Sequence, residues 1–68
     1  MNRFTTQELY EISDALMERR ARLLNRRAAL AANGITSAAA DRMIDAAREA
    51  HTKIEAEILD RAFAQEQA

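Results

Sequence analysis

The sequence predicts an all-α fold, a two-helix antiparallel hairpin that assembles into a four-helix bundle or a larger helical oligomer. The chain of 68 residues has no proline, and its single glycine, Gly34, lies at the middle. Glycine is favoured just past a helix end because it adopts the left-handed conformation without a Cβ clash. The runs on either side carry apolar side chains at helical spacing. We expect one domain over residues 1–68, with helices at about 6–33 and 38–64 and a turn at 33–37.

The start of the first helix carries two signals that agree on one register. With Thr5 as N-cap, Glu8 falls at the third helical position, which is the pattern of a capping box. The same register places Phe4 before the cap and Leu9 at the fourth position, the pattern of a hydrophobic staple. The first helix should therefore begin at about residue 6.

The turn is predicted from the residues that surround Gly34. Asn33 and Gly34 suit a helix end, and Thr36 or Ser37 can supply a side-chain oxygen to the free N–H groups of the second helix. We take Asn33, Gly34 and Thr36 as the structural turn residues.

Two apolar stripes run along the first helix. One is a seven-residue leucine repeat that suits a seam between helices, formed by Leu9, Leu16, Leu23 and Leu30. The second stripe includes Tyr10, Met17 and Leu24. The partner helix of the hairpin can cover only one of them, so the other requires a further chain.

The seam of the second helix alternates steps of four and three residues and contains Ala40, Ile44, Ala47, His51, Ile54 and Ile58. Leu59 and Phe63 lie four residues apart, hence on one side of the helix, and away from this seam. We predict that the surface between copies, or toward another protein, is formed by Tyr10, Met17, Leu24, Leu59 and Phe63.

Five arginines gather in the second half of the first helix: Arg19, Arg20, Arg22, Arg26 and Arg27. Guanidinium groups bind phosphate in a bidentate manner, so the cluster is a candidate anion site for RNA, DNA or a nucleotide. The alternative, which we favour, is pairing with acidic residues of the second helix. Arg20 and Arg27 fall within the apolar arc, where a charge must be paired or bind a ligand.

The remaining sequence offers little for catalysis or metal binding. The chain has no cysteine and one histidine, His51, whose predicted role is a hydrogen bond across the helix interface. A helix-bundle metal site would place Glu three residues before the histidine, where this chain has Arg48. Ser13 has no His/Asp arrangement in the sequence to activate it. We predict no catalytic residues, no metal and no cofactor.

We therefore expect a small, non-enzymatic, cytoplasmic protein that binds itself as a homodimer or higher oligomer and blocks or recruits another protein. Chains of this size with one clean hairpin are common among bacteriophage inhibitors of host proteins, so that role is one candidate. The alternative is an anion-binding protein that uses the arginine cluster. The near-neutral net charge of −1 and the lack of a long apolar stretch argue against a membrane partner.

Overall fold

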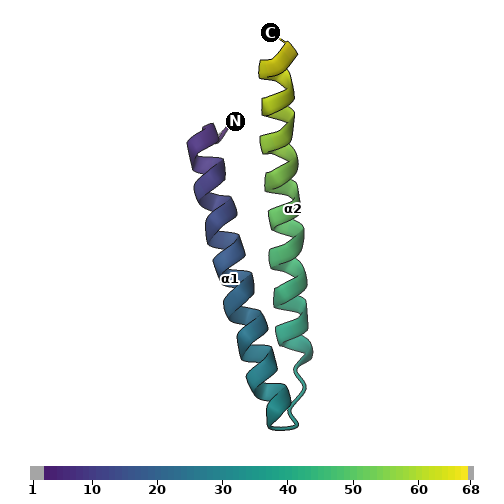
Figure 1. Cartoon of the computed structure of the whole chain (residues 1–68). Helices are drawn as coiled ribbons and strands as arrows, with labels where there is room; N and C mark the ends of the chain where they lie inside the picture. Colours follow the sequence, from purple (N-terminus) through teal and green to yellow (C-terminus); the bar gives the residue numbers. More distant parts are fainter. Residues whose placement is uncertain (1–2, 68) are drawn as a thin grey trace.

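The protein is a hairpin of two long helices, which confirms the predicted all-α fold (Figure 1). Helix α1 spans Thr6–Ala32 and helix α2 spans Ala38–Gln67, and the computed structural model describes residues 3–67. The helices run antiparallel, so that the two chain termini lie at the end opposite the turn. The molecule is a rod that measures 54 × 20 × 16 Å.

Helix α1 begins with the capping box that the sequence predicts. The backbone N–H of Glu8 donates to Thr5 Oγ1 at 3.1 Å, and the backbone N–H of Thr5 donates to Glu8 Oε1 at 2.9 Å. These two bonds satisfy two backbone donors that the first turn would otherwise leave free. The bond from the Thr5 N–H, followed by the contact with the Thr5 side chain, lowers the pKa of the Glu8 carboxyl.

The turn is a Schellman motif. Asn33 is the C-cap of α1, and the backbone N–H groups of Gly34 and Ile35 donate to the carbonyls of Ala31 and Leu30, each at 2.9 Å. Gly34 has φ +72°, in the left-handed region. A Cβ at this position would meet nothing within 4 Å, so the conformation alone favours glycine.

Helix α2 is capped by Ser37 rather than by Thr36. The Ser37 Oγ accepts a hydrogen bond from the backbone N–H of Ala40 at 3.1 Å, while Thr36 lies exposed in the turn. The sequence left both residues open as the cap. At the other end, α2 continues to Gln67, three residues past the expected end at Ala64.

The core between the helices is thin. Among residues 3–66, the buried apolar side chains are those of Leu9, Ile44 and Ala47, and Leu9 is the most enclosed at 2% exposure. The other seam positions are only half-buried, among them Leu16, Leu23, Leu30, Ile54 and Ile58. Two helices in contact along one line leave their flanks in solvent, so the seam cannot close around these side chains.

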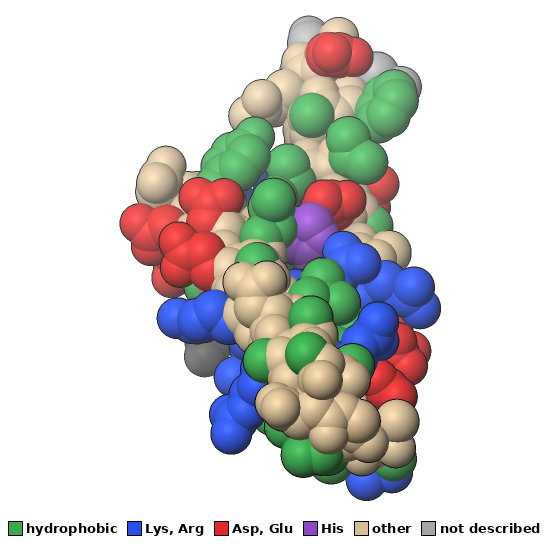
Figure 2. All heavy atoms as spheres, turned by 60° about the horizontal axis from the view of Figure 1, so that its bottom comes forward, with side chains coloured by type: hydrophobic (Ala, Val, Ile, Leu, Met, Phe, Trp, Pro, Cys, Tyr) green, Lys and Arg blue, Asp and Glu red, His purple; other side chains and the backbone are tan. Residues whose placement is uncertain are grey.

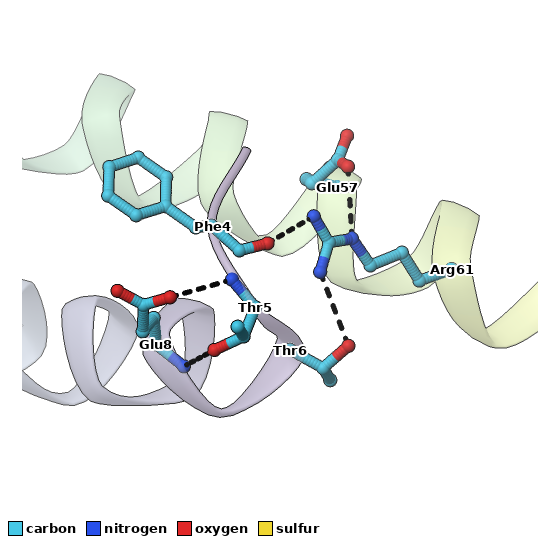
Figure 3. A network of polar contacts seen from close by, with 6 residues as sticks. All are labelled: Phe4, Thr5, Thr6, Glu8, Glu57 and Arg61. Atoms are coloured by element: carbon cyan, nitrogen blue, oxygen red, sulfur yellow. Dashed lines mark hydrogen bonds and ion pairs between the residues drawn. The ribbon is translucent and has the colours of Figure 1, made fainter. Parts of the chain in front are cut away.

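Arg61 joins the two helices at the open end of the hairpin (Figure 3). Its guanidinium donates to the Phe4 carbonyl and to Thr6 Oγ1, and its Nε donates to Glu57 Oε1 at 3.1 Å. The Arg61 side chain is only 26% exposed. These contacts hold the start of α1 against α2 where the apolar core ends.

Candidate interaction face

One long side of the hairpin carries large apolar side chains from both helices, and we call it the apolar face. On α1 it contains Tyr10, Met17 and Leu24, which are spaced by seven residues and therefore lie in line. All three are exposed, Met17 to 56%. The helix α2 does not cover this stripe.

Helix α2 contributes to the same side. A shallow hollow of about 220 Å³ is lined by Met17 and Leu24 from α1 and by His51 from α2, which places His51 beside the stripe. Leu59 and Phe63 follow His51 at separations of eight and twelve residues. Each four residues of an α-helix add a rotation of about 40°, so these two side chains lie progressively farther from the seam on the His51 side. Figure 2 shows the histidine at the surface, with hydrophobic side chains to its left and below it, acidic side chains above it and basic side chains to its right.

Leu59 and Phe63 are the most exposed large apolar residues of the described chain, at 59% and 61%. The five residues selected from the sequence as an interface are thus all exposed on the apolar face. The sequence did not identify the hollow beside Met17, because its walls come from both helices.

His51 makes a polar contact at the centre of the seam. Its Nε2 lies 3.0 Å from Ser13 Oγ on α1 and 3.2 Å from Glu55 Oε1 on its own helix. Ser13 is buried at 8% exposure, and the His51 side chain is 17% exposed. The predicted role of His51, a hydrogen bond across the helix interface, is confirmed.

The sequence shows no His/Asp arrangement around Ser13, but the fold brings His51 to it, and Glu55 lies beside that histidine. A nucleophilic triad, however, uses the two ring nitrogens for different partners, one for the serine and one for the acid. Here both partners face Nε2. The serine hydroxyl is also buried, so this arrangement suits a structural contact better than nucleophilic attack.

The arginine cluster is only partly paired. Arg27 forms an ion pair with Asp41 across the turn end, with NH1 and Oδ1 3.2 Å apart. Within residues 3–66, no acidic group lies within ion-pair distance of the other four, Arg19, Arg20, Arg22 and Arg26. The favoured interpretation, pairing with α2, therefore holds for Arg27 alone.

The acidic residues of α2 instead make contacts along their own helix. Asp45 lies near Arg48, Glu55 near His51 and Glu57 near Arg61, at separations of three or four residues. Such neighbours lie on the same side of a helix and meet without any constraint from α1. Arg20 is one of the residues that line the hollow of the apolar face.

In the described part of the chain, no three His, Cys, Asp or Glu residues come together as a metal site would require. Neither helix there has an apolar stretch long enough to cross a lipid bilayer.

Comparison of the chain with models of protein families, with characterised proteins and with solved structures gave no match. The function must therefore be argued from the geometry and chemistry of these two helices.

Proposed function

We propose that the protein is a small, non-enzymatic, cytoplasmic interaction module that forms homo-oligomers, most simply a dimer arranged as a four-helix bundle. The apolar face carries this proposal. Five large apolar side chains on it are 37–61% exposed, and removing apolar surface from water is worth about 25 cal/mol per Å². A second copy of the chain presents the same face, and a two-fold symmetric dimer joins identical surfaces.

The surface area of the chain supports association. The isolated hairpin exposes 5642 Å², whereas a compact monomer of 7.6 kDa is expected to expose about 4,300 Å². The excess of about 1,300 Å² is larger than the roughly 800 Å² that each partner buries in an interface of standard size. A hairpin that forms half of a four-helix bundle is expected to have a thin core and excess exposed surface when it is considered alone.

The proposed mode of action is binding, in which the module blocks or recruits a macromolecular partner. The buried position of Ser13 and the shallow hollows along the hairpin favour binding over catalysis, since catalytic sites enclose their substrates. A phage-type inhibitor of a host protein is one role of this kind.

The test is the mass in solution, measured by sedimentation equilibrium across a dilution series. The wild-type chain should sediment as a dimer or larger species and dissociate on dilution. Phe63→Asp should shift it toward the monomer, because a carboxylate would be buried in the apolar contact. Met43→Asp is the matched control, since Met43 is also exposed.

Met43 belongs to the opposite side of the hairpin. Met43 and Arg26 line the same hollow. Arg26 follows Leu24 by two residues on α1, which corresponds to a rotation of about 200°, so Arg26 lies on nearly the opposite side of that helix. A wild-type chain that remains monomeric at every concentration would refute the proposal. Dissociation by Met43→Asp and not by Phe63→Asp would show that the opposite side forms the contact.

A second candidate function is binding of an anionic ligand, RNA, DNA or a nucleotide. It is supported by four exposed arginines of α1 that form no ion pair within the described residues, Arg19, Arg20, Arg22 and Arg26. Binding to generic RNA should then weaken with salt, and Arg19→Ala combined with Arg22→Ala should reduce the salt slope by about one unit per lost phosphate contact. Arg48→Ala is the control, because Arg48 already lies near Asp45.

A further inference from the structure

The charges of the hairpin are separated along its length. Ser13 contacts His51 and Arg27 contacts Asp41, so the middle of α1, near residue 18, lies level with about residue 47 of α2. We call residues 19–47 the turn half, and residues 1–18 with 48–68 the open half. The turn half contains six arginines and two aspartates, a net charge of +4. The open half contains four basic and nine acidic residues, a net charge of −5.

The apolar face is also unequal along its length. Its stripe on α1 decreases in size toward the turn, from Tyr10 through Met17 and Leu24 to Ala31. The exposed Leu59 and Phe63 of α2 add bulk to the open half. Near the turn, by contrast, the face is hollowed by a depression of about 220 Å³ beside Ala31 and Ile35.

From these two gradients we infer that two copies pack apolar face to apolar face with their turns at opposite ends. This rests on the proposed homo-oligomer and adds the orientation of its subunits. The +4 half of each copy then lies beside the −5 half of the other. Leu59 and Phe63 of each copy meet the small residues and the hollow near the partner's turn.

The opposite orientation, with both turns at the same end, is unfavourable on both counts. It places like charges together at each end and opposes the bulky side chains of the two open halves. Each half is about 27 Å long, half of the 54 Å rod, and the screening length at physiological salt is about 8 Å. The electrostatic energy of each half therefore depends mainly on the charge of the partner half directly beside it, and the more distant half of the partner has little effect.

Distances between spin labels test the orientation. The chain has no cysteine, so Ala32→Cys labels the turn end and Gln7→Cys the open end, both at exposed positions. With turns at opposite ends, each label should lie on the order of 40 Å from its copy in the partner, since α1 has 27 residues rising 1.5 Å each. A mixture of the two labelled variants should add a distance below about 20 Å between turn and open ends.

The outcomes separate this inference from the proposal beneath it. A dimer in which two Ala32→Cys labels lie below about 20 Å apart would overturn the orientation and leave the homo-oligomer intact. A chain that stays monomeric in sedimentation would refute both.

The salt dependence of the dimer dissociation constant is a second test of the orientation, and it requires no substitution. Opposite charges meet in the inferred dimer, so raising NaCl from about 50 to 500 mM should raise its dissociation constant severalfold. In a dimer with like charges together, the same change should lower the dissociation constant, and that result would contradict the inference.

Discussion

Thr5 and Glu8 determine where α1 begins, and they do so through two reciprocal hydrogen bonds rather than through burial. Both side chains are exposed, so the contacts act on the free backbone groups of the first turn. The same bonds favour the ionised form of Glu8 and lower its pKa. The same pair of hydrogen bonds therefore fixes the start of α1 and lowers the pKa of Glu8.

We predict that Thr5→Ala lowers the free energy of unfolding by about 1 kcal/mol, the usual cost of losing an N-cap side chain. Thermal or urea unfolding followed by circular dichroism measures this. Thr52→Ala is the control, because the Thr52 hydroxyl bonds the carbonyl of Arg48 inside α2 and Ala has the higher helix propensity. Equal losses in the two variants would show that the cap does not act as described.

The pH dependence of Glu8 follows from the direction of its pKa shift. The pKa is lower in the folded chain than in the unfolded chain, so the ionised carboxylate stabilises the fold. This contribution is present above the ordinary glutamate pKa of about 4.3 and is lost as the pH falls through the lowered value. An NMR titration of the Glu8 carboxyl carbon should give a midpoint below that of a glutamate in a disordered peptide, and a midpoint above it would contradict the capping box.

At the scale of the elements, the turn depends on one backbone conformation. Gly34 has a positive φ and open space around it, so a substitution costs conformational energy without any clash. We predict that Gly34→Asn is the mildest substitution, that Gly34→Ala costs about 1–2 kcal/mol, and that Gly34→Val costs more. Urea unfolding of the three variants measures the order. If Asn is as damaging as Val, the left-handed conformation is not the reason for glycine here.

The seam between α1 and α2 should respond unequally along its length. Leu9 is buried, whereas Leu23 is only half-buried, so fewer contacts are lost at Leu23. We predict that Leu9→Ala costs about 2–5 kcal/mol and that Leu23→Ala costs less when both are measured under monomeric conditions. A larger cost at Leu23 than at Leu9 would contradict the unequal burial of the two leucines in the hairpin.

Local signals in the sequence predict most of the hairpin. The cap at Thr5, the end at Gly34 and the leucine repeat each depend on residues within a few positions of one another, and such patterns are visible in sequence alone. Contacts between the helices are different. The bond between Ser13 and His51 depends on how the two helices align, which no short segment specifies.

The pairing of the arginines shows the same limit. Arg27 and Asp41 pair because they lie near the turn, where the alignment of the helices is fixed by the chain. Farther from the turn, the acidic groups of α2 contact basic neighbours on their own helix. The presence of arginines on α1 and acidic residues on α2 was therefore not enough to predict which of them form ion pairs.

At the scale of the whole molecule, stability and association should be linked. A lone hairpin keeps most of its seam half-exposed, and a second copy would shield it. We predict that the melting temperature rises with protein concentration over a hundredfold range, because binding of the folded form raises apparent stability. Phe63→Asp should remove most of this dependence. A wild-type melting temperature that is independent of concentration would mean that the hairpin folds without association.

The hydrogen bond between Ser13 and His51 restricts how each helix can rotate about its own axis. The short turn fixes the lengthwise alignment of the helices near Gly34, but the leucines of α1 and the alanines and isoleucines of α2 would still pack after a small rotation of either helix. After such a rotation the Ser13 hydroxyl would move away from the His51 ring, and an unsatisfied enclosed hydroxyl costs about 1–3 kcal/mol. A single polar pair thus selects one rotational setting from several that apolar side chains alone would accept.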